Sequence, residues 1–220
     1  MKLIIGNKNY SSWSLRGWLA CKQSGLPFEE ITVPLYGEEW DRTKLGDDFA
    51  PSHGKVPILW DGETVIWDSL AIIDWLADKT HRDRFWPKDE TARGMARSMA
   101  AEMHSSFLAV RQELPMNIRL RLEDKAISAE CQADAVRILS LWAEARARFG
   151  KQGPFLFGTF GAADILYAPV VTRFRTYGFT LPGFAEAYSE AILEHDWMQQ
   201  WCAAAVTEDW SIERFDAIAN

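Results

Sequence analysis

The sequence contains few of the residues that support disulfide, metal or dithiol chemistry. Among its 220 residues are three cysteines, Cys21, Cys131 and Cys202, and four histidines. The cysteines are widely separated and form no C-x-x-C pair, and the histidines do not have metal-ligand spacing. An odd number of scattered cysteines argues against a disulfide scaffold or a structural zinc site, and is typical of a reducing compartment. We therefore expect no bound metal, and three cysteines that act as small apolar residues.

The sequence also lacks an excess of positive charge and any long apolar run. Its formal net charge is −7, from 24 Lys and Arg against 31 Asp and Glu. Nucleic acids and anionic membranes attract proteins with surplus Lys and Arg, so we expect neither as the main partner. No apolar run is long enough to span a bilayer, and no basic and then apolar leader opens the sequence. Together with the cysteine pattern, this predicts a cytoplasmic protein.

The composition that remains is typical of a globular protein with sizeable cores. Hydrophobic residues make up 48% of the sequence and charged residues 25%. A chain of 220 residues is long enough for one large domain or two modest ones. The 11 tryptophans favour helices that are packed through bulky side chains.

Residues 1–80 predict a small sheet combined with helices. The apolar run Lys2–Ile5 is typical of a buried strand, and Asp61-Gly62 between two apolar runs is a strong hairpin signal. The expected elements are a strand at 2–5, a helix ending before Gly25, a strand at 28–35, a loop with a short helix at 36–51, strands at 56–60 and 64–67, and a helix at 69–78. This order predicts a thioredoxin-like α/β fold.

Residues 88–220 predict an all-helical second domain, after a linker at 83–89. A helix that starts at Glu90 carries apolar side chains three or four residues apart as far as Leu114. Pro115 is expected to kink or end this helix, and the helical pattern resumes at Met116–Arg119. Further helices are expected at 128–149, 162–177, 184–193 and 196–206.

A cluster of hydroxyl residues stands at the start of the first helix. Ser11, Ser12 and Ser14 are explained either as helix caps or as ligands of an anion, which the N–H groups and the dipole of a helix N-terminus favour. A thioredoxin-like redox protein carries C-x-x-C at this position. Because serines stand there, dithiol exchange by the protein's own cysteines is excluded, and a reacting sulfur must arrive with a ligand.

Three motifs in this order resemble the N-terminal domain of the cytosolic glutathione transferases, in particular the serine-type classes and the zeta-like bacterial members. They are Ser11–Ser14 followed by Arg16, then Gly54–Leu59, then Asp68–Ile72. In the second half, Asp164 matches the family's helix-start motif, with Gly161 in place of its Ser or Thr cap. The resemblance implies a glutathione-binding domain at 1–80, a helical domain at 88–220, a homodimer, and glutathione as a substrate without a metal.

The resemblance also implies roles for the residues of the serine cluster. Ser11 aligns with the catalytic serine, whose hydroxyl stabilises the glutathione thiolate. Ser12 is the alternative, because it lies four residues before Arg16 as in other members; we favour Ser11. Ser14 is expected to cap the helix while Ser11 faces the ligand, and Arg16 is expected to be an ion-paired structural residue.

The residues that the resemblance assigns to glutathione come from the second and third motifs: Lys55, Val56, Pro57, Asp68 and Ser69. The Val56 backbone would pair with the main chain of the glutathione cysteine, like an added strand. Asp68 would meet the ammonium group of the γ-glutamyl residue, and Ser69 at the helix start its carboxylate. Lys55 would contact the glycyl carboxylate, with a solvated lysine as the alternative.

The electrophile is expected to bind between the two domains. Its candidate contacts are Tyr10, Trp13, Met103, His104, Phe107, Arg111 and Asn117. The zeta class carries a cysteine where this sequence has Trp13, which puts maleylacetoacetate-type isomerisation in question. The activity that the resemblance implies is transfer of glutathione to a small electrophile. The alternatives are a glutathione-dependent isomerase or peroxidase on the same fold, or a glutathione-binding module without catalysis.

Overall fold

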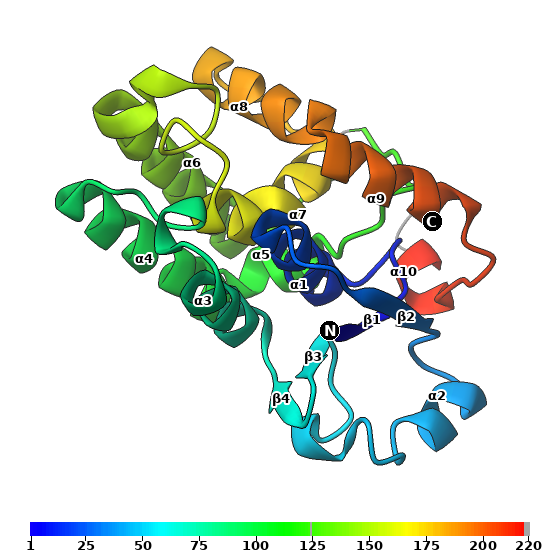
Figure 1. Ribbon diagram of the computed structural model, residues 1–220. Helices are drawn as coiled ribbons and strands as arrows, with labels where there is room; N and C mark the ends of the chain where they lie inside the picture. The colour runs from blue at the N-terminus through cyan, green and yellow to red at the C-terminus, as the bar shows by residue number, and fades with distance from the viewer. Residues whose placement is uncertain (124, 218–220) are drawn as a thin grey trace.

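The structure, a computed structural model, describes residues 1–123 and 125–217. Figure 1 shows a small sheet on one side of the molecule and a bundle of helices on the other, with α1 and α7 where the two meet. The first domain contains β1 (Lys2–Gly6), α1 (Ser12–Ser24), β2 (Glu29–Val33), α2 (Glu38–Thr43), β3 (Ile58–Asp61), β4 (Thr64–Ile66) and α3 (Ser69–Lys79).

The sheet has the strand order β2-β1-β3-β4, with β1 and β2 parallel and the other pairs antiparallel. β1 lies in its centre because its apolar side chains are buried on both faces: Leu3 and Ile5 belong to the main core, whereas Ile4 packs with Trp40 and Phe49. The parallel β1-α1-β2 unit followed by an antiparallel hairpin confirms the thioredoxin-like fold that the sequence predicted.

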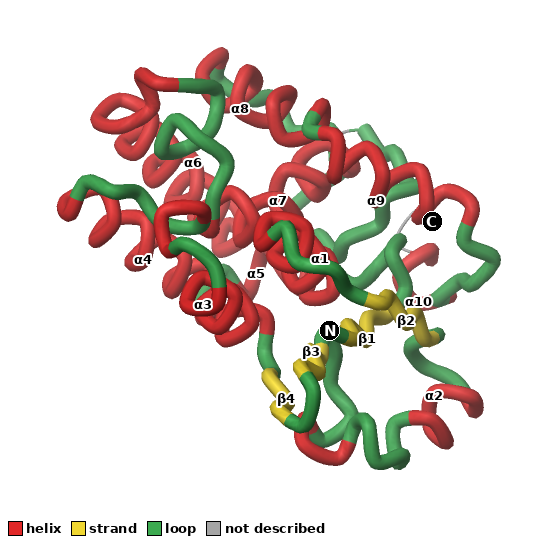
Figure 2. Tube along the Cα trace, in the orientation of Figure 1, coloured by secondary structure: helices red, strands yellow, loops and turns green. Residues whose placement is uncertain are grey.

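The second domain consists of helices, which Figure 2 distinguishes from the strands. They are α4 (Glu90–Ser105), α5 (Leu108–Glu113), α6 (Ala129–Phe149), α7 (Ala162–Thr176), α8 (Gly183–Glu194), α9 (Asp196–Thr207) and α10 (Glu213–Asp216). Nearly every residue of α7 is buried, and this helix packs against α1 of the first domain. In the described residues, no helix combines the length and apolar character needed to cross a membrane.

The expected continuous helix from Glu90 to Leu114 is wrong, because the chain breaks well before Pro115. α4 ends at Ser105, and Phe107 has a left-handed backbone with φ 61°. The backbone N–H groups that start α5 donate to the carboxylate of Asp134, which lies on α6. This distant cap stabilises a new helix start that the local pattern does not reveal. The expected resumption at Met116–Arg119 is also wrong, since that segment is not helical.

Gly161 stands at the start of α7 at a position that leaves no room for a side chain. A Cβ atom at this position would lie 2.8 Å from the backbone oxygen of Phe85. The Asp164 carboxylate compensates, because it accepts from the N–H of Gly161 at 2.9 Å and from the N–H of Leu156 at 3.1 Å. Burial raises the pKa of Asp164 from 3.8 to about 7.

Candidate active site

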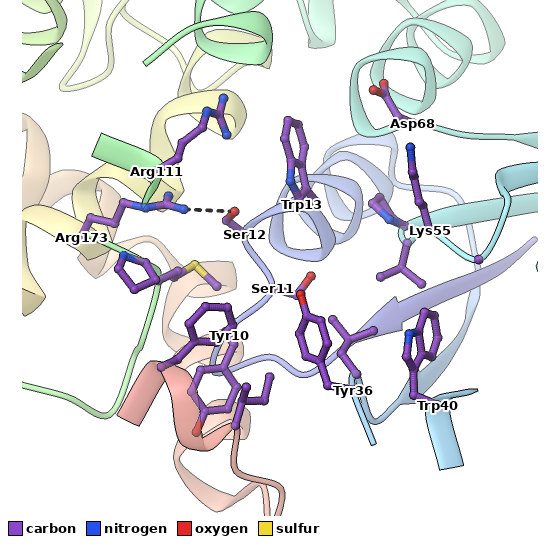
Figure 3. A pocket seen from close by; sticks show the side chains of 18 of the residues that line it. Tyr10, Ser11, Ser12, Trp13, Tyr36, Trp40, Lys55, Asp68, Arg111 and Arg173 are labelled. Atoms are coloured by element: carbon purple, nitrogen blue, oxygen red, sulfur yellow. Dashed lines mark hydrogen bonds between the residues drawn. The ribbon is translucent and has the colours of Figure 1, made fainter. Parts of the chain in front are cut away.

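A cavity of about 710 Å³ opens where the start of α1 faces the second domain. Both domains and the C-terminal segment form its walls, and Figure 3 shows most of the side chains. The lining residues are Tyr10, Ser11, Ser12, Trp13, Leu35, Tyr36, Trp40, Gly54, Lys55, Val56, Pro57, Asp68, His104, Arg111, Pro115, Met116, Arg173, Ile212 and Phe215. In the described part of the chain, no group of three His, Cys, Asp or Glu side chains is arranged to hold a metal ion.

Ser11 caps α1 and lines the cavity at the same time. Its Oγ accepts from the backbone N–H of Ser14 at 3.3 Å, and its hydroxyl donates to Ser14 Oγ at 2.7 Å. Ser14 is fully buried, and its Oγ accepts from the N–H of Gly6 at 2.9 Å. The expectation that Ser14 caps the helix is therefore wrong: Ser11 is the cap, and Ser14 fastens Ser11 to the end of β1.

Ser12 also lines the cavity but is turned toward the second domain. Its Oγ accepts from Nη2 of Arg173 at 3.2 Å, the hydrogen bond drawn in Figure 3. The other donors of Arg173 reach the carbonyl oxygens of Leu114 and Pro169. Burial, and secondly the charge of Arg111, lowers the pKa of Arg173 to about 9, so the guanidinium remains charged at neutral pH.

Three arginines gather around Ser12 and Trp13. The guanidinium carbons of Arg16 and Arg111 lie 4.7 and 4.9 Å from the centre of the Trp13 ring. Arg16 is fully buried; its Nε donates to the Leu166 oxygen, while Nη1 and Nη2 have no hydrogen-bond partner among the described residues. Burial, followed by the charges of Arg111 and Arg173, lowers the pKa of Arg16. Within the described ranges Arg16 has no ion pair, so that expectation is wrong.

Asp68 and Ser69 begin α3 at another wall of the cavity. One oxygen of the Asp68 carboxylate accepts from the N–H groups of Leu70 and Ala71, and the other lies 3.0 Å from Nε2 of His104. The Ser69 hydroxyl is buried and has no partner in the described part of the structure. A buried hydroxyl without a partner is unfavourable, and this one lies directly beside the cavity-lining Asp68.

The structure brings most of the residues expected to bind glutathione to one cavity. Lys55, Val56 and Pro57 line it on the approach to β3, where the Val56–Pro57 peptide bond is cis. Ser69 is fully buried and does not line the cavity. Figure 3 shows Lys55 and Asp68 on the side of the cavity opposite Arg111 and Arg173, with Trp13 between the two sides.

The residues expected to contact the electrophile divide into two groups. Tyr10, Trp13, His104 and Arg111 line the cavity, whereas Met103, Phe107 and Asn117 do not. Met103 and Phe107 are buried in the main core. The Asn117 side chain is buried in hydrogen bonds with Asn9 and Asp216.

Several lining residues were not identified from the sequence: Tyr36, Trp40, Arg173, Ile212 and Phe215. Arg173 lies within a segment that follows the family pattern, and its charge close to the apolar run Leu166–Val171 was the available signal. Ile212 and Phe215 come from a short C-terminal segment without periodicity. Nothing in the sequence indicates that this segment returns to the start of α1.

Both halves of the chain match protein-family models. The model of the glutathione S-transferase N-terminal domain matches residues 10–79, and that of the C-terminal domain matches residues 125–204. Glutathione S-transferase GstB of Escherichia coli is 24% identical over 181 residues, which cover 81% of this chain and 86% of the relative.

Solved structures agree with these matches. A bacterial zeta-class maleyl pyruvate isomerase in its holo form has a TM-score of 0.70 at 26% identity, over 96% of this chain and 100% of the other. A glutathione transferase homolog from Burkholderia GL BGR1, solved with bound glutathione, has a TM-score of 0.68 at 20% identity, over 94% of this chain and 98% of the other.

Proposed function

We propose that this chain, which belongs to the glutathione S-transferase family, transfers glutathione to a small electrophile that carries an anionic group. The observation that supports the first part is the convergence of three features on one cavity. These are the Ser11 hydroxyl at the start of α1, the Val56–Pro57 turn, and Asp68 at the start of α3. The arginines on the opposite wall support the second part.

Ser11 supplies the hydrogen bond that stabilises the thiolate. An ordinary thiol has a pKa of about 8.5, so only a few per cent is ionised near pH 7. A hydroxyl that donates to a sulfur anion contributes roughly 1.5–3 kcal/mol, which corresponds to about one to two pKa units. The dipole of α1 adds roughly 0.3–1 kcal/mol. Ser11 takes no proton in this scheme, because the thiol proton is released to solvent.

Ser14 prepares Ser11 for this role. The Oγ of Ser14 already accepts the N–H of Gly6, so its own hydroxyl proton can turn toward the Oγ of Ser11. Ser11 would then accept both the N–H and the hydroxyl of Ser14 and direct its own proton at the sulfur. Hydroxyl groups rotate to suit their partners, so the change from the bond observed between the serines requires no movement of the backbone.

The glutathione backbone would occupy the side of the cavity formed by the first domain. The Val56 main chain would pair with the cysteinyl residue, and the Ser69 hydroxyl would gain the partner that it lacks by donating to the γ-glutamyl carboxylate. Asp68 would meet the ammonium group. The thiolate attacks the electrophilic carbon, forms the C–S bond, and the leaving group departs with its electron pair.

Arg111 and Arg173 favour an anionic electrophile. Their hydrogen-bond acceptors within the protein are neutral oxygens of the backbone and of Ser12, so neither arginine forms an ion pair with a carboxylate in the described residues. The charge of Asp134 acts on Arg111 through space. Arginine is well suited to bind carboxylates through paired N–H groups. The same observation favours a second candidate, glutathione-dependent isomerisation of an unsaturated acid, in which the thiolate adds to the double bond and later leaves.

The matched electrophiles 4-(bromomethyl)benzoate and 4-(bromomethyl)benzamide test this proposal, because they differ mainly in charge. We expect glutathione-dependent turnover of both, with the benzoate preferred. Arg111→Gln should lower this preference about tenfold or more, the effect of one charged hydrogen bond, and Arg111→Lys should retain part of it. Arg137→Gln, at a surface arginine paired with Glu102, is the control. Absence of turnover would contradict transferase activity. Equal rates for the benzoate and the benzamide would contradict the preference for an anionic electrophile.

By the same resemblance we propose that the chain forms a homodimer and acts in the cytoplasm. Light scattering at micromolar concentration should give twice the mass of the chain. A monomer under these conditions would contradict the dimer without affecting the chemistry proposed for the cavity.

A further inference from the structure

The C-terminal segment, residues 208–216, is held against the start of α1 by hydrogen bonds between buried and half-buried polar groups. The hydroxyl of Tyr10 donates to the two carboxylate oxygens of Asp216, at 2.9 and 2.8 Å. The amide of Asn117 donates to the same carboxylate at 2.9 Å, and Arg119 donates to the Tyr10 hydroxyl at 3.0 Å. Tyr10, expected to contact the electrophile, therefore directs its polar end away from the cavity.

A second set of hydrogen bonds holds the other end of this segment. The Glu208 carboxylate accepts from the backbone N–H groups of Lys8 and Asn9, at 2.8 and 3.2 Å. Arg119 donates to the backbone oxygens of Glu208 and Trp210, both at 2.9 Å. The segment is thus held at both ends against the loop that precedes Ser11.

Between these two sets of hydrogen bonds, Ile212 and Phe215 form part of the cavity wall. The Phe215 ring lies 5.8 Å from the ring of Tyr10 and 6.2 Å from that of Tyr36. The guanidinium of Arg214 lies 3.9 Å from the centre of the Tyr36 ring, which joins the segment to the loop before α2. Figure 3 shows Tyr10 next to the ribbon of this segment, at the edge of the cavity away from Lys55 and Asp68.

We propose that Phe215 is a specificity-determining residue that limits the size of the electrophile, and that Asp216 is the positioning residue that holds it in place. This rests on the proposed function. α10 has four residues, too few to form a stable helix alone, so its position depends on the hydrogen bonds that hold the segment. Phe215 packs against Tyr10, which Figure 3 shows at the edge of the cavity away from Lys55 and Asp68. Its ring therefore limits the size of the electrophile and does not restrict the binding of glutathione.

The test uses two electrophiles with the same reactive carbon and different size, benzyl bromide and 1-(bromomethyl)naphthalene, at saturating glutathione. Phe215→Ala should raise the ratio of kcat/KM for the naphthyl over the benzyl compound by about tenfold or more, the lower range for one apolar pocket contact. Asp216→Ala should shift the ratio in the same direction. Phe215→Tyr and the exposed control Asp209→Ala should leave it unchanged, and KM for glutathione should stay within about twofold.

Calorimetry with the conjugates S-benzylglutathione and S-(1-naphthylmethyl)glutathione gives a corresponding ratio of binding affinities without turnover. A change in this ratio in Phe215→Ala supports the proposal even if catalysis is absent. An unchanged ratio in folded Phe215→Ala, or an equal loss for both conjugates, would overturn it. If the wild-type chain binds neither conjugate, both this inference and the proposed function are contradicted, whereas turnover with an unchanged ratio contradicts only the inference.

Discussion

The Asp68 carboxylate and the His104 imidazole join the two domains, with Oδ2 of Asp68 3.0 Å from Nε2 of His104. The other Asp68 oxygen caps α3 through the N–H groups of Leu70 and Ala71. The His104 ring also packs edge-on against Trp13, with ring centres 5.3 Å apart. A helix of the second domain therefore orients the acid that we assign to the glutathione ammonium group.

His104→Phe should weaken glutathione binding without a matching loss of kcat. The acceptor is a carboxylate that is about half exposed, so losing this hydrogen bond costs about 0.5–1.5 kcal/mol, and KM for glutathione should rise roughly two- to tenfold. Steady-state kinetics with glutathione as the varied substrate measure this, with His81→Phe at an exposed histidine as the control. A fall in kcat at constant KM would instead place His104 with the reacting groups.

Asp164 should make the stability of the fold depend on pH. Its folded-state pKa of about 7 exceeds the ordinary value of 3.8, so between these values the folded chain keeps a proton that the unfolded chain releases. This contribution is complete below the unfolded pKa and is lost as the pH rises through 7, with a slope of at most about 1.4 kcal/mol per pH unit.

Urea unfolding of wild type and Asp164→Asn between about pH 4 and pH 8 isolates this contribution. The variant should be less stable overall, because it cannot accept both backbone N–H bonds from Gly161 and Leu156. The free energy of unfolding of wild type minus that of the variant should fall as the pH rises. A difference that is constant with pH would show that Asp164 does not titrate in this range.

Ser12→Ala should lower the stability of the fold and change the binding of the electrophile, with little effect on the pKa of the glutathione thiol. The variant removes the acceptor of a buried charged donor, Arg173 Nη2, which costs about 1.5–3 kcal/mol of unfolding free energy. Denaturation in urea gives this loss. The pKa of the bound glutathione thiol should stay within a few tenths of a unit, whereas a shift comparable to that of Ser11→Ala would make Ser12 the thiolate donor.

The sequence was informative where a feature is local. Asp61-Gly62 predicted the hairpin, and helices α6 to α9 lie within one residue of their expected bounds. The serine cluster lies at the start of α1, where Ser11 and Ser12 line the cavity. Each of these depends on neighbours a few residues apart. The assignment to the glutathione S-transferase family also came from local motifs in a fixed order.

The remaining features depend on partners that are distant in the sequence. The break after α4 is stabilised by Asp134 on another helix, and Gly161 is required by the backbone of Phe85. Arg16 forms no ion pair in the described residues, and the charges of Arg111 and Arg173 act on it more strongly than that of Asp68. The wall formed by residues 208–216 is the clearest case, because the hydrogen bond between Glu208 and Lys8 joins residues about two hundred positions apart in the sequence.

The most direct test of the account is the pKa of the glutathione thiol bound to wild type and to Ser11→Ala, followed by the ultraviolet absorbance of the thiolate during a pH titration. The account predicts that the pKa rises by about one to two units in the variant, and that the pH profile of kcat/KM moves by the same amount. A folded Ser11→Ala variant that binds glutathione with an unchanged thiol pKa would contradict it.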